Sequence, residues 1–211
     1  MKILCLADIH GSNTVFSELL NLEAVYDAVF IAGDILIPHQ EKSLAPLLVK
    51  VQKHLQVPIY LTPGNHDYWK KSLWAPYKQI SPLIDETVEI RNGWKVFFTP
   101  WSTPFGNWNW MRPDKHFQED FIYTIPDDVK IIVSHGPAFG FIDLVRFQHV
   151  GSVDLLNTIK RLPHLQYVLT GHIHGWEYDS IKEGNILFQN ISCVNEDYLY
   201  KGQFITLELP D

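Results

Sequence analysis

A continuous apolar run passes directly into residue types that bind metals in ILCLADIHG, residues 3–11 of the chain. Five apolar residues without alternation are typical of a β-strand that is buried on both faces of a sheet. Asp8 and His10 follow where this strand should end. The stretch therefore predicts a central strand with metal-binding side chains at its carboxyl end, where open α/β sheets bind their ligands.

The same arrangement recurs four more times along the chain. Each time a short apolar run ends, and residues of metal-ligand type follow it closely. The apolar runs are Ile3–Ala7, Ala28–Ala32, Ile59–Leu61, Ile131–Val133 and Tyr167–Leu169. The residues that follow them are Asp8 and His10, then Asp34, then Asn65 and His66, then His135, and finally His172 and His174. We expect these side chains to gather at one edge of the fold.

Three apolar stripes at helical spacing separate or follow these runs, at residues 15–24, 44–55 and 153–162. Ser12 or Asn13 can cap the first stripe, and Pro163 ends the third. Strands that alternate with helices indicate an α/β fold. Ile186–Ile191 and Phe204–Leu209 are typical of strands without a helix between them. We therefore predict two packed mixed sheets flanked by helices, in a single domain that spans residues 1–211.

The composition narrows the class of protein. The 211 residues are 46% apolar and 19% charged, which is typical of a globular domain. The net charge of −7 argues against a surface that binds nucleic acid strongly, although it allows a nucleotide in a local pocket. Two cysteines without a Cys-x-x-Cys motif fit a reducing compartment. About five apolar residues precede Asp8, too few for a secretion signal or a membrane span, so we expect a cytoplasmic protein.

Five short motifs combine these polar residues in a fixed order. They are Asp8-Ile9-His10, Gly33-Asp34, Gly64-Asn65-His66-Asp67, Ser134-His135 and Gly171-His172-Ile173-His174. One such motif alone is as often a turn or a helix cap. The ordered set resembles the calcineurin-like metallophosphoesterase superfamily, from Asp8 to about Tyr198. The resemblance implies an αββα sandwich with a dinuclear metal site at the carboxyl ends of the strands.

The resemblance also implies a role for each residue. One metal would be bound by Asp8, His10 and His174, the other by Asn65, His135 and His172, and Asp34 would bridge the two. His66 and Asp67 match the family's catalytic histidine and its acidic partner. The donors are imidazole, carboxylate and amide groups without thiolate, which suit borderline metals such as Mn, Fe, Co, Ni or Zn. We expect Mn among these metals.

These roles imply a mechanism of phosphoester hydrolysis. A hydroxide that bridges the metals would attack phosphorus in line. Asn65 and both metals would hold the phosphate oxygens. His66 would stabilise or protonate the departing oxygen, and Asp67 would fix the tautomer of His66 or raise its basicity. Two divalent cations against the carboxylates of Asp8 and Asp34 leave a net charge of about +2, which attracts phosphate within an acidic protein.

Other segments narrow the substrate. The chain lacks the Asp-Arg-Gly sequence that Ser/Thr protein phosphatases and dinucleoside polyphosphate hydrolases place near the second motif. Residues 134–138, 151–152 and 191–193 are similar to the small metallophosphoesterase-domain-containing phosphodiesterases, which implies a cyclic nucleotide or related small diester as substrate. The alternatives are a phosphomonoesterase or protein phosphatase with the same metals, and a non-catalytic scaffold of the same fold. The oligomeric state is left open.

Four of the seven tryptophans lie between Trp94 and Trp110. The segment carries Pro104 and Gly106 and follows the apolar run Val96–Phe98, so it predicts a loop after a strand. One interpretation is an aromatic wall that stacks on a nucleobase or an aryl leaving group. The other is a loop that buries its own aromatic side chains against the sheet.

Overall fold

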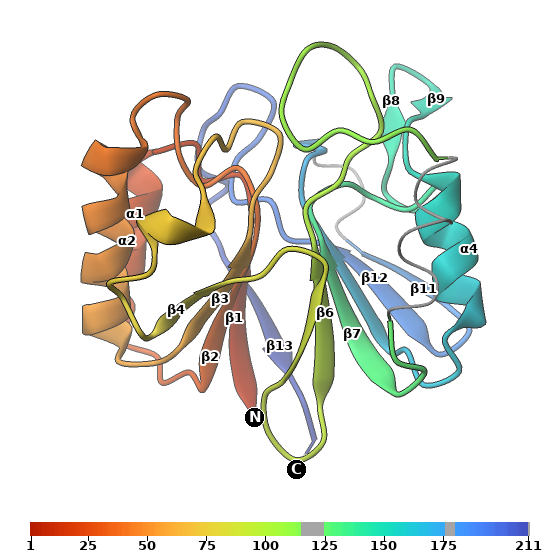
Figure 1. Ribbon diagram of the computed structural model, residues 1–211, viewed down its shortest axis with the longest axis horizontal. Coiled ribbons are helices and arrows are strands. Elements are labelled where there is room, and N and C mark those ends of the chain that lie inside the picture. Colours follow the sequence, from red (N-terminus) through yellow and green to blue (C-terminus); the bar gives the residue numbers. More distant parts are fainter. Residues whose placement is uncertain (115–124, 176–179, 211) are drawn as a thin grey trace.

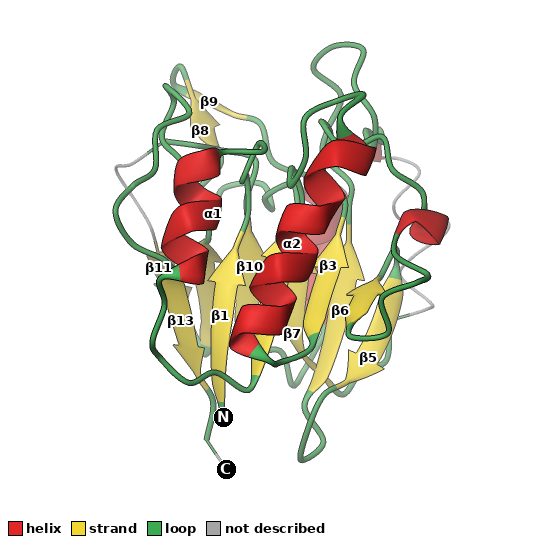
Figure 2. Cartoon of the chain, turned by 90° about the vertical axis from the view of Figure 1, so that its left-hand side faces the viewer, coloured by secondary structure: helices red, strands yellow, loops and turns green. Residues whose placement is uncertain are grey.

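The two sheets pack face to face, and helices cover the outer face of each (Figures 1 and 2). The computed structural model describes residues 1–114, 125–175 and 180–210. On the first sheet lie α1 (Asn13–Leu20) and α2 (Glu41–Leu55), and on the second lies α4 (Val153–Arg161). The predicted αββα sandwich is therefore confirmed. None of the described helices is long and apolar enough to cross a membrane.

The first sheet has five strands in the order β13-β1-β2-β3-β4. Strands β1 to β4 run parallel, and β13 pairs with β1 in the antiparallel direction. The bounds are β13 (Ile205–Glu208), β1 (Lys2–Leu6), β2 (Ala28–Ala32), β3 (Ile59–Thr62) and β4 (Ile80–Pro82). A 3₁₀-helix, η1 (Lys71–Leu73), lies between β3 and β4.

The second sheet has six strands in the order β11-β12-β10-β7-β6-β5. The four central strands are parallel, whereas the edge strands β11 and β5 are antiparallel to their neighbours. The bounds are β11 (Ser180–Glu183), β12 (Ile186–Asn190), β10 (Tyr167–Thr170), β7 (Val129–Ser134), β6 (Lys95–Thr99) and β5 (Glu86–Glu89). A short hairpin, β8 (Leu144–Val145) and β9 (Gln148–His149), stands apart from both sheets.

Alternate side chains of the central strands enter different cores. In β1, Leu4 and Leu6 pack beneath α1 and α2, whereas Ile3 and Cys5 lie between the two sheets. In β7, Ile132 packs with the α4 residues on the opposite side of the molecule. A strand buried on both faces needs apolar residues at every position, which explains the continuous apolar runs in the sequence.

The three described α-helices lie where the sequence predicts them, and so do the strands β1, β2, β3, β6, β7, β10, β12 and β13. Ser12 rather than Asn13 caps α1, because the Ser12 hydroxyl accepts a hydrogen bond from the Val15 amide at 3.4 Å. The first stripe was predicted to extend toward residue 24, but α1 ends at Leu20. The edge strands β4, β5 and β11 and the hairpin strands β8 and β9 were not predicted, because none of them carries a continuous apolar run of the length that marks a central strand.

Candidate metal centre

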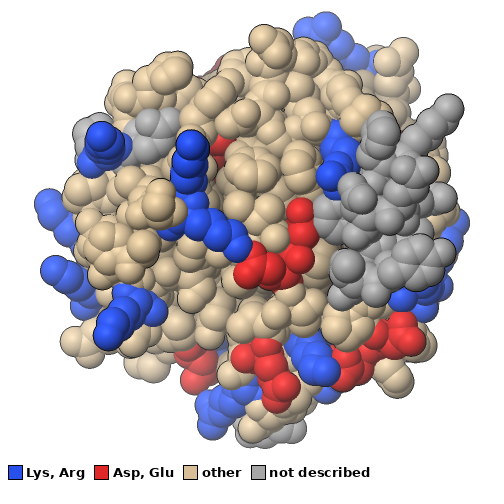
Figure 3. All heavy atoms as spheres, in the orientation of Figure 1, with Lys and Arg blue, Asp and Glu red and all other residues tan. Residues whose placement is uncertain are grey.

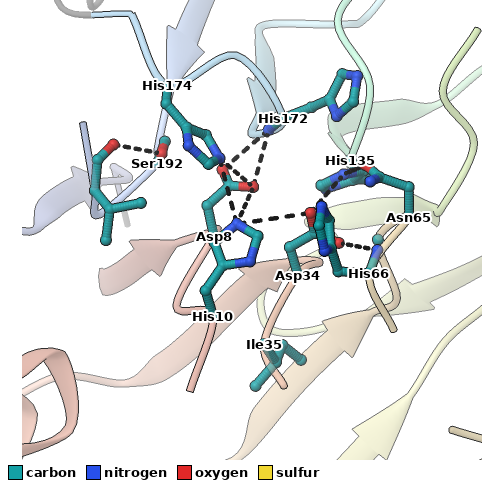
Figure 4. Close-up of polar contacts among 12 residues, drawn as sticks. Asp8, His10, Asp34, Ile35, Asn65, His66, His135, His172, His174 and Ser192 are labelled. Atoms are coloured by element: carbon teal, nitrogen blue, oxygen red, sulfur yellow. Dashed lines mark hydrogen bonds and ion pairs between the residues drawn. The ribbon is translucent and has the colours of Figure 1, made fainter. Parts of the chain in front are cut away.

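The predicted site residues come from both sheets and meet at the carboxyl ends of the parallel strands (Figure 4). The first sheet supplies Asp8 and His10 after β1, Asp34 after β2, and Asn65 with His66 after β3. The second sheet supplies His135 after β7 and His174 after β10. Both Asp8 and Asp34 are buried. The site therefore lies where the two sheets face each other.

Asp8, His10 and His174 form one group of donor atoms. His174 Nε2 lies 3.4 Å from Asp8 Oδ1 and 3.4 Å from His10 Nε2, and His10 Nε2 lies 4.0 Å from Asp8 Oδ1. Metal–donor distances in proteins are about 2.0–2.2 Å, so donors that share an ion stand roughly 3–4 Å apart. The group fits one metal ion.

Asp34 stands between this group and a second one. Its Oδ2 atom lies 3.8 Å from His10 Nε2 and 3.6 Å from His135 Nε2. Its Oδ1 atom accepts a hydrogen bond from the His66 amide at 2.7 Å. Because Asp34 approaches a donor of each group, its carboxylate is placed to bridge two metal ions.

His135 and Asn65 belong to the second group. His135 Nδ1 lies 2.8 Å from the Ala32 carbonyl oxygen, which can only accept, so Nδ1 carries the proton. Its Nε2 atom is then a free electron-pair donor, 2.8 Å from Asn65 Oδ1. Metal-bound histidines are commonly oriented by such a hydrogen bond from the other ring nitrogen.

The imidazole of His172 is placed differently from the other predicted ligands. Its backbone amide donates to both oxygens of Asp8, at 3.2 and 3.0 Å. Its ring lies 5.0 Å from the His135 ring and 5.1 Å from the Phe105 ring, between centroids, and in Figure 4 it points away from the Asp8 carboxylate. The structure thus brings six of the seven predicted ligands together, and the imidazole of His172 stays a predicted ligand.

His66 lies at the site, whereas the Asp67 carboxylate binds backbone amides, so Asp67 as the acidic partner of His66 stays a prediction. The His66 ring lies at the site, 4.9 Å from the His10 ring between centroids. The buried Asp67 carboxylate instead accepts hydrogen bonds from the backbone amides of Gly64, Ile35 and Leu36, at 2.9, 3.2 and 3.1 Å. Within the described residues, the Asp67 carboxylate makes no hydrogen bond to the His66 ring. Asp67 ties together the loops after β2 and β3, because their amides converge on its side chain.

The backbone is strained at four of the predicted ligands. Asp8, His10, Asp34 and His172 have φ angles of 56°, 47°, 51° and 69°, which residues other than glycine rarely adopt. Such strain collects at functional sites. Gly64 adds a steric constraint, because a Cβ there would lie 2.6 Å from His135 Cε1. Gly64 is required for close approach.

Burial controls the charge of the centre. It lowers the pKa of His10 to about 3 and that of His172 to about 3, and it lowers the pKa of His66 and His135 as well. These imidazoles are therefore neutral at pH 7 and have lone pairs for a cation. Burial, with Asp8 and Asp67 nearby, raises the pKa of Asp34. Divalent cations between the two groups would relieve the repulsion of these carboxylates, so the donor set fits metal ions.

The tryptophans of the segment from Trp94 to Trp110 have two kinds of surroundings. Trp94 is buried against Tyr167, Trp101 donates to Asp85, and the Trp110 indole donates to the Asp67 carbonyl oxygen at 2.8 Å. Trp108 is the one of the four that is placed over a site residue, since its ring lies 4.3 Å from the His66 ring between centroids. The packing interpretation therefore holds for three tryptophans.

The comparison with known protein families agrees with this geometry. The family Calcineurin-like phosphoesterase matches residues 1–176. The chain belongs to this family. Members of this family are hydrolases that act on phosphoric esters, and they typically use a dinuclear metal site of the kind that the candidate donors could hold.

The individual relatives of this chain share less than a third of its sequence. The chain is 27% identical over 197 residues to the human Metallophosphoesterase domain-containing protein 1, an alignment that covers 92% of this chain. It spans only 59% of that relative's length.

Two solved structures are similar in fold. The protein TT1561 of Thermus thermophilus has a TM-score of 0.67 and 13% identity, over 90% of this chain and 88% of that one. The Phosphopantetheinyl Hydrolase of Mycobacterium tuberculosis has a TM-score of 0.61 and 12% identity, over 93% and 90%. At these identities both structures support the fold alone.

Proposed function

We propose that this phosphoesterase is a metal-dependent phosphodiesterase that hydrolyses a cyclic nucleotide or a related small diester. The observation that carries the proposal is Asp34, whose carboxylate lies between the donors His10 and His135. A carboxylate shared by two donor groups can hold two cations about 3.5–4 Å apart, the spacing used for in-line displacement at phosphorus. The diester preference rests on the similarity of residues 134–138, 151–152 and 191–193 to small phosphodiesterases.

The proposed metal ligands are the seven residues predicted from the sequence. Asp8, His10 and His174 would hold one ion, Asn65, His135 and His172 the other, and Asp34 both. The imidazole and carboxylate donors suit Mn, and Fe, Zn, Co and Ni are alternatives. When bound, the ions supply Lewis-acid polarisation of the phosphoryl oxygens and lower the pKa of water.

The chain's own residues would do the remaining work. Asn65 Oδ1 faces His135, so its amide nitrogen is free to donate to a phosphate oxygen. His66 is neutral at pH 7 because burial lowers its pKa, and a neutral imidazole serves the departing oxygen as a hydrogen-bond donor. Asp67 would act as a positioning residue, since its carboxylate holds the loops that present Asp34 and Asn65.

The proposed function includes a domain organisation, a cellular compartment and a class of substrate. Residues 1–211 would act as one domain in the cytoplasm, and the two free, buried cysteines are compatible with a reducing compartment. On the face shown in Figure 3, basic side chains of the described residues lie mainly toward the left and upper edges and acidic ones near the centre and lower edge, so no continuous basic surface crosses this face. A small diester or nucleotide therefore fits better as substrate than a nucleic acid duplex.

The test compares a diester with a monoester in the purified protein. With Mn²⁺, kcat/KM for bis(p-nitrophenyl) phosphate is expected to exceed that for p-nitrophenyl phosphate at least about tenfold. Chelation should abolish turnover and Mn²⁺ should restore it. His66→Ala should lower kcat about 10²- to 10⁴-fold with the metal content unchanged, and Glu23→Gln, at an exposed residue before β2, serves as control. Faster monoester turnover would indicate a phosphomonoesterase, and metal binding without any turnover would indicate a scaffold.

A further inference from the structure

We infer that Phe105, Trp108 and Tyr198 form an aromatic collar around the metal centre that binds a flat ring of the substrate. The diester would then carry a nucleobase or an aryl group. This inference rests on the proposed phosphodiesterase function, which it makes more specific. The collar is defined by these three residues, which lie on two loops far apart in the sequence.

Each ring of the collar contacts a histidine of the candidate site. The Trp108 ring lies 4.3 Å from the His66 ring between centroids, at an interplanar angle of 33°. The Phe105 ring lies 5.1 Å from the His172 ring. The Tyr198 ring lies 4.9 Å from the His10 ring and 5.2 Å from the His174 ring. The collar thus flanks both predicted metal positions.

The loop that carries Phe105 and Trp108 is held in place at both ends. At its base, the Ser102 amide donates to the Trp110 carbonyl oxygen, and the Arg112 amide donates to the Ser102 carbonyl oxygen. Near its end, the Asn109 side chain and the Trp110 indole both donate to the Asp67 carbonyl oxygen, at 3.1 and 2.8 Å. Trp108 is therefore positioned by the same segment that presents His66.

Tyr198 is presented by a tight turn on the opposite side of the site. The Asn195 side chain accepts hydrogen bonds from the amides of Asp197 and Leu199, and Tyr198 itself has a φ of 59°. A left-handed tyrosine costs free energy, and this turn stabilises it. The turn places the phenol ring edge-on against His10, at an interplanar angle of 85°.

The collar exposes apolar surface where a ligand would cover it. Phe105, Trp108 and Tyr198 are 55%, 40% and 52% exposed, although their inner edges rest on the site histidines. A phosphate bound at the metals would place its substituent between these rings. Stacking on aromatic side chains tolerates any base, because every base has a π-face. The collar therefore selects for a planar ring without reading its hydrogen-bonding edge.

Trp108 is the collar residue whose ring lies against His66. Because its ring covers His66, which would serve the departing oxygen, a group stacked on Trp108 is on the leaving-group side. We therefore expect Trp108 to determine specificity for the leaving group more strongly than Phe105 or Tyr198.

The experiment measures binding of two ligands that differ by one ring. Adenosine 5′-monophosphate and ribose 5-phosphate carry the same phosphomonoester, and only the first has a base. Calorimetric titration of the Mn²⁺-loaded protein should show about tenfold tighter binding of adenosine 5′-monophosphate. Trp108→Leu should reduce this ratio to below about threefold and leave the affinity for ribose 5-phosphate unchanged, whereas Trp108→Phe should keep most of the ratio.

The control is Phe147→Leu, which removes an exposed ring at the tip of the β8–β9 hairpin. It should leave the ratio unchanged. A ratio near one in the unmodified protein, or an undiminished ratio in Trp108→Leu, would overturn the collar. Diester turnover on the same samples separates the two ideas. Turnover with a ratio near one refutes only the collar, whereas the expected ratio without turnover of any diester refutes only the phosphodiesterase function.

Discussion

Asp85 holds the start of the loop that carries Phe105 and Trp108, at the point where this loop leaves strand β6. Its Oδ1 atom accepts hydrogen bonds from the Thr99 hydroxyl at 2.8 Å and from the Trp101 indole at 3.1 Å. Burial raises the pKa of Asp85 to about 6, and these two hydrogen bonds only partly oppose the rise. At neutral pH the ionised carboxylate therefore sits in surroundings that favour its protonated form.

The raised pKa predicts how stability depends on pH. The pKa of an aspartate in the unfolded chain is about 3.9, so the folded protein binds the proton of the Asp85 carboxyl group more tightly than the unfolded chain does. The stabilisation from Asp85 is full below about pH 4 and is lost as the pH rises through about 6. Asp85→Asn should remove this dependence, because an amide oxygen can accept both hydrogen bonds. Relative to the wild type, the unfolding free energy of the variant should be roughly 2 kcal/mol higher at about pH 7.5 than at about pH 4.5. Urea unfolding at both pH values measures this difference, and parallel curves would contradict the assignment.

The loop that follows β3 passes very close to the side chains of Asp34 and His135. Gly64 lies directly before Asn65, and a Cβ there would lie 2.6 Å from His135 Cε1 and closer still to Asp34 Oδ1. Neither neighbour can move without displacing a candidate metal ligand. The Gly64 amide also donates to Asp67, which secures the loop from the other side.

Gly64→Ala is therefore expected to disrupt the centre. The added methyl group should displace Asp34 or His135 and lower bound Mn²⁺ at least about tenfold, as measured by elemental analysis after dialysis. The matched control is Gly184→Ala, in the turn between β11 and β12, where a Cβ would meet open space and only the φ of 56° is strained. That variant should lose about 1 kcal/mol of stability and keep its metal. Full metal content in Gly64→Ala would show that the loop can adapt.

For the molecule as a whole, the candidate metal centre lies between the two sheets. Three strands of the first sheet and two of the second present its donors, and the apolar layer between the sheets also joins them. An ion that binds the folded chain alone stabilises it by mass action, by about 2.7 kcal/mol at a hundredfold excess over Kd.

Removal of the metal should therefore lower the unfolding temperature. For a chain of this size we expect a fall of roughly 5–10 °C on chelation, measured by calorimetry and reversed by added Mn²⁺. In Asp34→Asn, which weakens the shared ligand, the unfolding temperature should respond little to chelation. Equal responses of Asp34→Asn and the wild type would mean that the ion acts elsewhere.

The sequence by itself determined the central strands, the three described helices and the set of candidate ligands. Each of these follows from a local pattern, because a doubly buried strand needs a continuous apolar run and its ligands follow within a few residues. Only the tertiary structure decided which tryptophan faces the site, that Tyr198 joins it, that Asp67 binds backbone amides and that the His172 ring turns toward Phe105. These contacts join residues far apart in the chain, so they depend on how the two sheets pack and not on any local pattern.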